Sequence, residues 1–208
     1  MSSRDYYEEA WRSLPEDLEP ADFSVRSRFL LEHVGAGDRV LDVGCGEGRF
    51  AAELAAAGAE VVGIDVAEEP LRRARARHPE LDLRLVDVHG PWPLADARFD
   101  VVWAGEAIEH VADTSAWMSE VRRVLRSGGK LLASTPDHGP LTLLATALSS
   151  SAFAARFDPR SEHLRFYNRA TLSRLIEDFG FEEVQIARHG GRPGARRLLL
   201  ASAIRSRF

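Results

Sequence analysis

Apolar and polar positions alternate along this chain in two distinct periods. Short apolar runs, several of which end at glycine or aspartate, have the length of buried strands. They lie at 39–44, 60–65, 81–87, 98–105 and 130–136. Elsewhere apolar residues recur every three or four positions, as on one face of a helix, at 25–34, 49–58, 68–78 and 115–129. Strands that alternate with helices predict a parallel sheet with right-handed crossovers and helices on both of its faces.

The C-terminal third of the chain follows a different pattern. Residues 140–157 are weakly amphipathic and predict a helical insertion, and 168–180 predict a well-marked helix. The runs 181–189 and 196–205 flank the glycine-rich loop 190–195. Because a short loop of this kind joins antiparallel neighbours, the two runs predict an antiparallel pair at the edge of the sheet.

Composition and charge narrow the class of protein. Hydrophobic residues make up 45% and charged residues 28% of the 208 residues, which is typical of one soluble domain spanning residues 1–208. The single cysteine, Cys45, excludes an internal disulfide. A polar N-terminus and the absence of a run near the roughly 20 apolar residues of a transmembrane helix predict a cytoplasmic protein without integral membrane association. The net charge of −5 comes from an acidic excess in the first 150 residues, which makes a nucleic-acid partner unlikely.

A glycine-rich segment, VLDVGCGEGRF at 40–50, joins the first predicted strand to a helix. Gly44, Gly46 and Gly48 let the backbone turn tightly and let a ligand approach it, and amides at a helix N-terminus attract a negative group. Asp65 ends the second predicted strand, where a carboxylate can accept hydrogen bonds from ribose hydroxyls. By themselves these residues predict a nucleoside-containing cofactor, either adenosyl or nicotinamide.

Five segments give the chain a resemblance to the class I S-adenosylmethionine-dependent methyltransferases over nearly its whole length. They are VLDVGCGEGRF, VVGIDVAEEPL, LVDVHGPWPLADARFDVVWAGEAIEHV, VLRSGGKLLASTP and FYNRATLSRLIEDFGFEEVQI. The resemblance implies an α/β, Rossmann-like, doubly wound sheet of seven strands, with an antiparallel last strand and helices on both faces. It also implies S-adenosyl-L-methionine as the cofactor.

The same resemblance assigns cofactor contacts to individual residues. The glycine loop would hold the methionine end, the end of the second strand the ribose, and the residues after the third strand the adenine. The residues assigned in this way are Asp42, Gly44, Gly46, Asp65, Val66, Asp87 and Val88. Because such a fold supplies only the donor site, the acceptor chemistry is expected on loops beyond the strand ends.

The stretch EAIEH at 106–110 follows the fourth predicted strand, where that chemistry belongs. If it is helical, Glu106, Glu109 and His110 share one face, because positions i, i+3 and i+4 lie together. EAIEH is similar to an ExxEH motif, followed much later by a histidine, in the O-methyltransferases of ubiquinone biosynthesis and in small-RNA 3′-terminal 2′-O-methyltransferases. There the motif binds a divalent cation, which implies a metal site of Glu106, Glu109, His110 and His163 in this chain.

Three interpretations of EAIEH stay open at this point. Carboxylates with imidazoles favour Mg²⁺ or Mn²⁺, with zinc as a further option, and such a cation would lower the pKa of an attacking hydroxyl. Alternatively, His110 and Glu106 are the catalytic pair without a metal, His110 acting as the general base. In the third interpretation the acids only stabilise the start of a helix through its macrodipole.

These features predict an S-adenosylmethionine-dependent methyltransferase that methylates a hydroxyl of a small-molecule acceptor, such as a catechol-like or sugar diol. The alternatives are methylation of nitrogen or carbon, 2′-O-methylation of an RNA end, and a cofactor-binding module without activity. The acidic body argues against RNA. The intact glycines and aspartates argue against a module without activity.

Two segments are expected to border the site. Residues 1–24 form a lid, with the aromatic residues of DYYEEAW at 5–11 over the cofactor, or else an amphipathic helix packed on the sheet. Residues 137–167 form an acceptor-side insertion that roofs the acceptor pocket. Its apolar face, which carries Phe153 and Phe157, is expected to meet the acceptor or a membrane surface.

Overall fold

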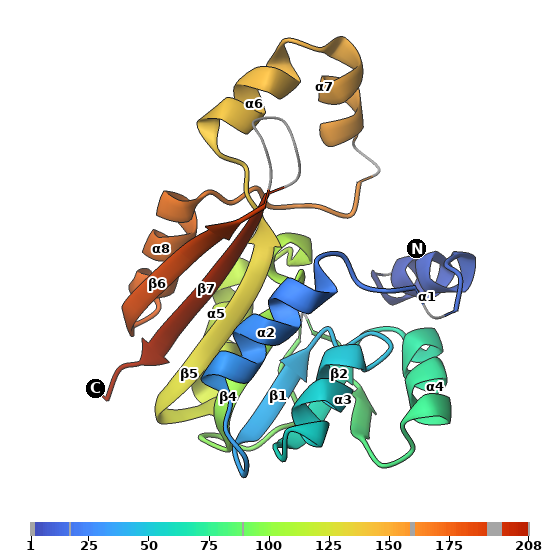
Figure 1. The fold of residues 1–208 in the computed structure, drawn as a ribbon, viewed down its shortest axis with the longest axis vertical. Coiled ribbons are helices and arrows are strands. Elements are labelled where there is room, and N and C mark those ends of the chain that lie inside the picture. The colour runs from blue at the N-terminus through green and yellow to red at the C-terminus, as the bar shows by residue number, and fades with distance from the viewer. Residues whose placement is uncertain (1–2, 17, 89, 159–160, 191–196, 208) are drawn as a thin grey trace.

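A seven-stranded mixed sheet forms the centre of the protein in the computed structural model, which describes residues 3–16, 18–88, 90–158, 161–190 and 197–207 (Figure 1). The strand order is β3-β2-β1-β4-β5-β7-β6. The strands are β1 (Arg39–Val43), β2 (Glu60–Asp65), β3 (Asp82–Leu85), β4 (Phe99–Gly105), β5 (Leu125–Pro136), β6 (Phe181–His189) and β7 (Leu198–Arg205). Strand β7 pairs antiparallel with both β5 and β6, and the remaining pairs are parallel. This confirms the predicted sheet and its antiparallel last strand.

Helices cover both faces of the sheet (Figure 1). They are α1 (Ser3–Ser13), α2 (Phe23–His33), α3 (Arg49–Ala56), α4 (Glu68–Arg77), α5 (Thr114–Val124), α6 (Pro140–Ala147), α7 (Ser150–Arg156) and α8 (Arg169–Asp178), with a short 3₁₀ helix, η1 (Ile108–His110). Trp103 and Leu30 lie in the core beneath α2 and α3, whereas Trp117 and Ile176 lie in the core beneath α5 and α8. Each such fully buried side chain contributes roughly 1.5–3 kcal/mol through the hydrophobic effect. Among the described residues, no helix has the length and apolar character needed to cross a bilayer.

Helix α5 ends earlier than the sequence pattern predicts. The prediction of a helix over 115–129 is wrong beyond Val124, because Leu125 has extended backbone with φ −69° and ψ 141°. Leu125 is fully buried and pairs with Phe99 of β4, and the register shifts just after this pair. Gly128 then takes φ +72°, a value that glycine adopts without strain. Burial of Leu125 against the sheet therefore outweighs one further turn of helix.

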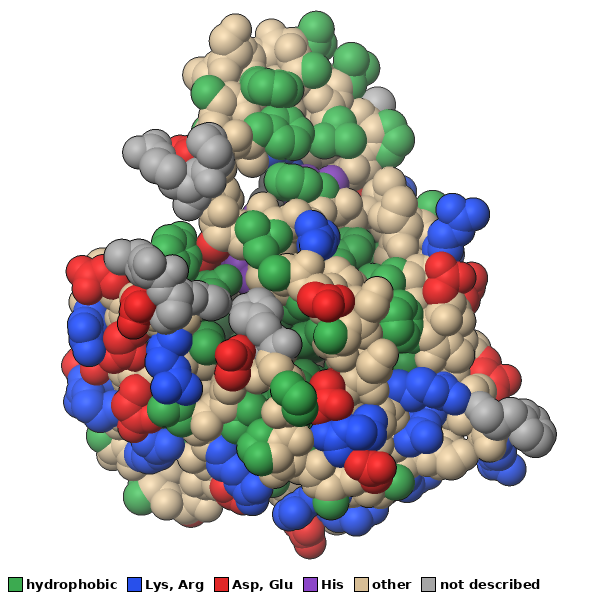
Figure 2. Space-filling model, turned by 180° about the vertical axis from the view of Figure 1, so that it is seen from behind, with side chains coloured by type: hydrophobic (Ala, Val, Ile, Leu, Met, Phe, Trp, Pro, Cys, Tyr) green, Lys and Arg blue, Asp and Glu red, His purple; other side chains and the backbone are tan. Residues whose placement is uncertain are grey.

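The insertion is two short helices instead of one. Helix α6 ends at Ala147, and the Ser149 side chain accepts a hydrogen bond from the Ala152 amide at 3.3 Å, which caps the start of α7. Together α6 and α7 form a lobe that projects beyond the carboxyl ends of the strands (Figure 1). Apolar side chains gather on this lobe in Figure 2, and Leu148 is 81% exposed. Most of the predicted loop at 190–195 lies outside the described residues.

Candidate active site

The glycine-rich loop between β1 and α3 has the open backbone that a bound ligand requires. Gly44 and Gly46 take φ values of +73° and +52°, which side chains other than glycine rarely allow. The Gly44 amide donates a hydrogen bond to the Ile64 carbonyl at 2.8 Å, which ties the loop to β2. A Cβ atom on Gly46 would lie 3.0 Å from the Trp11 ring of α1. The loop is thus closely approached by the N-terminal helix.

Asp65, at the end of β2, connects this loop to the start of α4. Its Oδ2 accepts a hydrogen bond from the Gly46 amide at 2.9 Å, and its Oδ1 accepts one from the Ala67 amide at 3.0 Å. Burial raises the pKa of Asp65, although these backbone donors partly offset the rise. Asp65 lines a cavity of about 240 Å³ with Val66 and Val88. Asp65 therefore holds the glycine loop, and its expected contact with a ribose in this cavity stays a prediction.

Asp87 is not brought to this cavity. Its side chain is exposed, and it does not line either of the two cavities described here. Its backbone carbonyl accepts a hydrogen bond from the Gly90 amide at 3.2 Å, which makes it part of the turn after β3. The expected contact of Asp87 with the adenine therefore stays a prediction.

A buried carboxylate and a buried guanidinium lie behind the glycine loop. Asp42 is 1% exposed, and burial raises its pKa to about 7 although the Arg26 charge opposes that rise. The Arg26 guanidinium lies over the Phe50 ring at 4.6 Å and lines a cavity of about 940 Å³. Sequence analysis missed Arg26. The available signal was its position four residues before buried Leu30, which places a charge on the apolar face of α2.

The two cavities meet beyond the ends of β1 and β4. The residues that line both of them are Trp11, Gly44, Glu106, His110 and Glu162. The smaller cavity extends from here towards Asp65, and the larger one extends along the glycine loop and beneath the α6–α7 lobe. A donor in the smaller cavity and an acceptor in the larger one would meet at this junction.

The stretch EAIEH is not a regular helix, so the expectation that Glu106, Glu109 and His110 share one helical face is wrong. Glu106 takes φ +57°, and its amide donates to the Ser134 carbonyl at 2.9 Å, which continues the pairing of β4 with β5. Only residues 108–110 then form a helix, the single 3₁₀ turn η1. Because the sheet holds Glu106 outside that turn, spacing alone does not align it with Glu109 and His110.

Glu109 is a fully buried carboxyl group. Its Oε2 accepts a hydrogen bond from the Thr135 hydroxyl at 3.0 Å, whereas its Oε1 is buried with no hydrogen-bond partner among the described residues. Burial raises the pKa of Glu109 to about 8, and the nearby Glu106 carboxylate adds to the rise. A buried acceptor without a partner is costly, so a cation or proton donor at Oε1 would stabilise the site.

His110 is held in one tautomer. Its Nδ1 lies 3.1 Å from the Glu162 carbonyl, and because a carbonyl can only accept, Nδ1 carries the proton. In the neutral ring, Nε2 then has the lone pair. Burial lowers the pKa of His110, which favours this neutral form. Nε2 can therefore act as a base or as a metal ligand.

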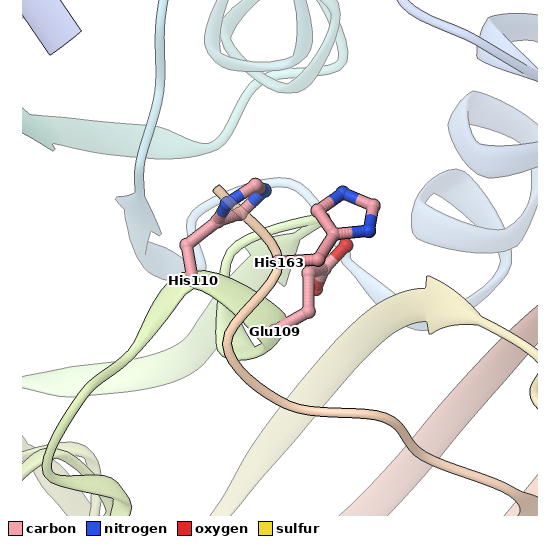
Figure 3. Close-up of side chains that lie close together, drawn as sticks. All are labelled: Glu109, His110 and His163. Carbon is pink, nitrogen blue, oxygen red and sulfur yellow. The ribbon is translucent and has the colours of Figure 1, made fainter. Parts of the chain in front are cut away.

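Glu109, His110 and His163 lie together (Figure 3). Their ligand atoms all lie within 4.8 Å of one another, and the two imidazole rings are 4.9 Å apart. The segment that carries His163 is fixed by the Glu109 carbonyl, which accepts hydrogen bonds from the Leu164 and Arg165 amides at 2.8 and 3.0 Å. Within the described part of the chain, Glu106 stands outside this cluster. The structure therefore brings together three of the four residues predicted to bind a metal.

The α6–α7 lobe lines the larger cavity with small or polar side chains. They are Thr142, Ala145, Thr146, Ala152 and Ala155. Phe153 and Phe157 do not line this cavity and are 51% and 40% exposed, so their expected contact with the acceptor is not seen, and their contact with a membrane surface stays a prediction. The break between α6 and α7 explains the difference, since each short helix turns a separate face towards the cavity.

Helix α1 lies against the cofactor side of the site. Tyr7 and Trp11 line the smaller cavity, and the Tyr7 ring lies 6.1 Å from that of His110. Tyr6 lines neither of the two cavities. A buried arginine of α4, Arg73, holds the end of α1 by donating a hydrogen bond to the Trp11 carbonyl at 3.0 Å.

Comparison with known proteins agrees with this geometry. A methyltransferase domain family matches residues 6–186. The chain is 38% identical over 156 residues to a probable S-adenosylmethionine-dependent methyltransferase of Mycolicibacterium smegmatis. This match covers 73% of the present chain and 55% of the other protein. It is 36% identical over 157 residues to a ubiquinone biosynthesis O-methyltransferase of Ruegeria. This match covers 72% of the present chain and 62% of the Ruegeria protein. The match thus spans little more than half the length of these relatives.

Solved structures show the same fold. Phosphoethanolamine N-methyltransferase 2 of Haemonchus contortus, in complex with S-adenosyl-L-methionine, superimposes with a TM-score of 0.78 at 17% identity, covering 99% of this chain and 60% of that one. A Burkholderia thailandensis 1,6-didemethyltoxoflavin-N1-methyltransferase with bound S-adenosylhomocysteine superimposes with a TM-score of 0.70 at 18% identity. The superposition covers 98% of this chain and 84% of that one. The chain belongs to the methyltransferase-domain family of class I S-adenosylmethionine-dependent methyltransferases.

Proposed function

We propose that this protein transfers the methyl group of S-adenosyl-L-methionine to a hydroxyl oxygen of a small-molecule acceptor with two neighbouring hydroxyls, such as a catechol. The observation that carries the proposal is the cluster of Glu109, His110 and His163, in which His110 lines both cavities and His163 lines the larger one. The relatives named as ubiquinone biosynthesis O-methyltransferases support oxygen as the acceptor atom.

The residues around the smaller cavity suit the adenosyl donor. Asp65, Val66 and Val88 line it together with Gly44 of the glycine loop. The open backbone at Gly44 and Gly46 leaves room for the methionine portion, and Arg26 offers a positive charge to its carboxylate. Trp11 excludes water from the loop, which favours transfer by keeping the donor and acceptor aligned.

The cluster fits a divalent cation. Glu109 supplies a buried oxygen without a partner, and His110 and His163 supply imidazole nitrogens, a donor set that suits Mn²⁺, Mg²⁺ or zinc. Such a cation would lower the pKa of an acceptor hydroxyl and hold the two neighbouring oxygens. Glu106, at the same junction, is placed to accept a proton or to bind through water.

Methyl transfer to catechol, measured with and without a chelator, tests the proposal. Activity should fall with the chelator and return with Mn²⁺ or Mg²⁺. Calorimetry should show that Mn²⁺ binding weakens at least tenfold in Glu109→Gln, which removes the negative charge of a ligand, and in His163→Ala, which removes a ligand. His78→Ala, which changes an imidazole outside both cavities, is the matched control.

A second candidate mechanism uses His110 as a general base without a metal. The contact of Nδ1 with the Glu162 carbonyl favours it, because that contact leaves Nε2 free to accept a proton. Turnover that survives exhaustive chelation, together with Mn²⁺ binding that His163→Ala leaves unchanged, would replace the metal mechanism with this one.

A further inference from the structure

Charged side chains line the larger cavity along its whole length: Arg26, Asp42, Glu47 and Arg49 around the glycine loop, Glu106 and Glu162 at the junction, and Asp137, Arg156 and Arg197 farther along the sheet. Glu106 lies at the end of β4, whereas Arg156 and Arg197 belong to α7 and to the residue before β7. Strand β5 separates β4 from β7 in the sheet. An acceptor that enters this cavity can therefore meet the charges of Arg156 and Arg197 as well as the residues at the junction.

Arg197 has a buried hydrogen-bond donor, its Nε. Its Nε is buried and has no hydrogen-bond partner among the residues that the structure describes, and the side chain lines the cavity. Its backbone is fixed, because its carbonyl accepts a hydrogen bond from the Asp137 amide at 2.8 Å. Buried donors in folded proteins are normally paired, so a ligand atom is the expected partner.

Arg156 and His138 border the same part of the cavity. Arg156 lines it and forms no ion pair within the described ranges. His138 lines the same cavity, and its pKa is lowered by burial, by the Arg156 charge and, to a smaller degree, by His163. His138 is almost fully buried and packs edge-on against Phe166, with 5.0 Å between the ring centres.

Two acidic residues, Asp137 and Glu162, line the same cavity. Asp137 forms an ion pair with Arg188 of β6 at 3.1 Å, and Arg188 does not line the cavity. The Glu162 carboxylate raises the pKa of Tyr7 in addition to the effect of burial, so it lies towards α1. Arg188 therefore offsets the charge of Asp137, and Glu162 lies where the two cavities meet.

We propose that Arg156, Arg197 and His138 form a subsite for an anionic group, a carboxylate or a phosphate, that the methyl acceptor carries. The inference rests on the proposed function, because it assigns the group that orients the acceptor with its hydroxyl towards the cluster. Guanidinium groups bind carboxylate and phosphate oxygens through paired, charge-assisted hydrogen bonds. The preferred acceptor is thus an anionic small molecule.

Two acceptors that differ by one carboxylate test the subsite. The wild-type protein should methylate 3,4-dihydroxybenzoate with a kcat/KM at least tenfold above that for catechol. Arg156→Ala and Arg197→Ala should each reduce this ratio about tenfold, with catechol turnover little changed, and Arg156→Lys should restore part of the ratio. Arg174→Ala, on the exposed face of α8, is the control. Equal use of the two acceptors, or a ratio that neither variant changes, would overturn the proposal.

A binding experiment separates failure of the subsite from failure of O-methylation. Benzoate and phenyl phosphate are titrated by calorimetry into the protein with bound S-adenosylhomocysteine. Binding of either anion that Arg156→Ala and Arg197→Ala weaken at least tenfold supports the subsite even if no catechol is methylated, and the stronger ligand identifies the anion. Binding that the variants leave unchanged, or no binding of either anion, overturns it.

Discussion

At the residue scale, several side chains at this site serve the fold and the candidate chemistry at once. Asp65 is the clearest case, because both of its carboxylate oxygens hold backbone amides that shape the cofactor region. Asp42 and Glu109 are buried acids whose pKa values are raised to about 7 and about 8. Such groups reduce stability when ionised, and proteins keep them mainly where a ligand uses them.

Replacing Asp65 should weaken cofactor binding. In Asp65→Ala the affinity for S-adenosylhomocysteine should fall by about 1.5–3 kcal/mol, roughly 10- to 100-fold, because a charge-assisted acceptor is lost and the Gly46 amide is released. Calorimetry measures the change, and Asp82→Ala, on the exposed part of β3, is the control. An affinity equal to that of the wild type would show that Asp65 acts on neither the ligand nor the loop.

Asp42 should make stability depend on pH. Its folded pKa, about 7, lies above the ordinary value of 3.8, so the folded state holds this proton more tightly than the unfolded state. Stability from this group is therefore greatest at low pH and is lost as the pH rises from about 4 to about 7. Relative to Asp42→Asn, which does not titrate, the wild type should lose about 2–4 kcal/mol across that window.

Urea unfolding of both proteins at intervals between pH 4 and pH 8 measures this difference. The free energies of unfolding should diverge as the pH rises, with the wild type falling behind the variant. Two curves that run parallel would mean that Asp42 titrates at its ordinary pKa or that Arg26 fully compensates its charge.

At the scale of elements, the contacts of α1 with α4 decide whether α1 covers the cofactor. The Glu8 carboxylate accepts hydrogen bonds from the Glu68 and Glu69 amides at 2.8 and 3.1 Å, at the N-terminus of α4. Arg73 bonds to the Trp11 carbonyl and forms a buried ion pair with Glu47 of the glycine loop at 3.1 Å. Helix α1 is thereby fixed to the loop that it covers.

Loosening α1 should weaken cofactor binding without unfolding the sheet. Trp11→Ala should raise the Kd for S-adenosylhomocysteine about tenfold, mainly through faster release, because the ring over Gly46 is removed. Glu8→Gln should raise it about two- to fivefold, since a neutral side chain interacts less with the α4 dipole. Stopped-flow release measurements test this, with exposed Glu9→Ala as the control. Unchanged release in Trp11→Ala would remove the lid role.

At the scale of the whole molecule, the cofactor region joins segments that are distant in sequence. The cavities are lined by α1, the loops after β1, β2 and β4, and the segment around His163. A ligand that contacts all of these stabilises the folded state as a whole, since it binds the native protein and not the unfolded chain.

Thermal unfolding should therefore respond to adenosyl ligands and not to NAD. S-adenosylhomocysteine at about 100 times its Kd should add about 2.7 kcal/mol, which corresponds to a rise in Tm of roughly 5–11 °C for a domain of this size. NAD at the same concentration should leave Tm unchanged. A rise with NAD and none with S-adenosylhomocysteine would contradict the assignment of the cofactor.

The sequence by itself determined the sheet and the cofactor loop. The apolar runs at 39–44 and 60–65 bury their side chains on both faces whatever surrounds them, so they predict β1 and β2 nearly to the residue. Glycines occur at a strand-to-helix turn because the backbone there takes positive φ values, so the sequence of that one segment is enough to predict the turn. The resemblance of five segments to one family then predicted how the strands are arranged in a single seven-stranded sheet.

Only the tertiary structure decided the rest of the site. Glu106 does not lie on the expected helical face, because its amide donates a hydrogen bond to Ser134 of β5. The spacing of residues within EAIEH carries no information about that distant partner. Likewise, α5 stops early because Leu125 is buried against β4. His163 meets Glu109 through hydrogen bonds to a carbonyl more than fifty residues earlier in the chain. Periodicity reports the preferences of one segment, whereas these positions depend on long-range partners whose burial and hydrogen bonds outweigh local propensity.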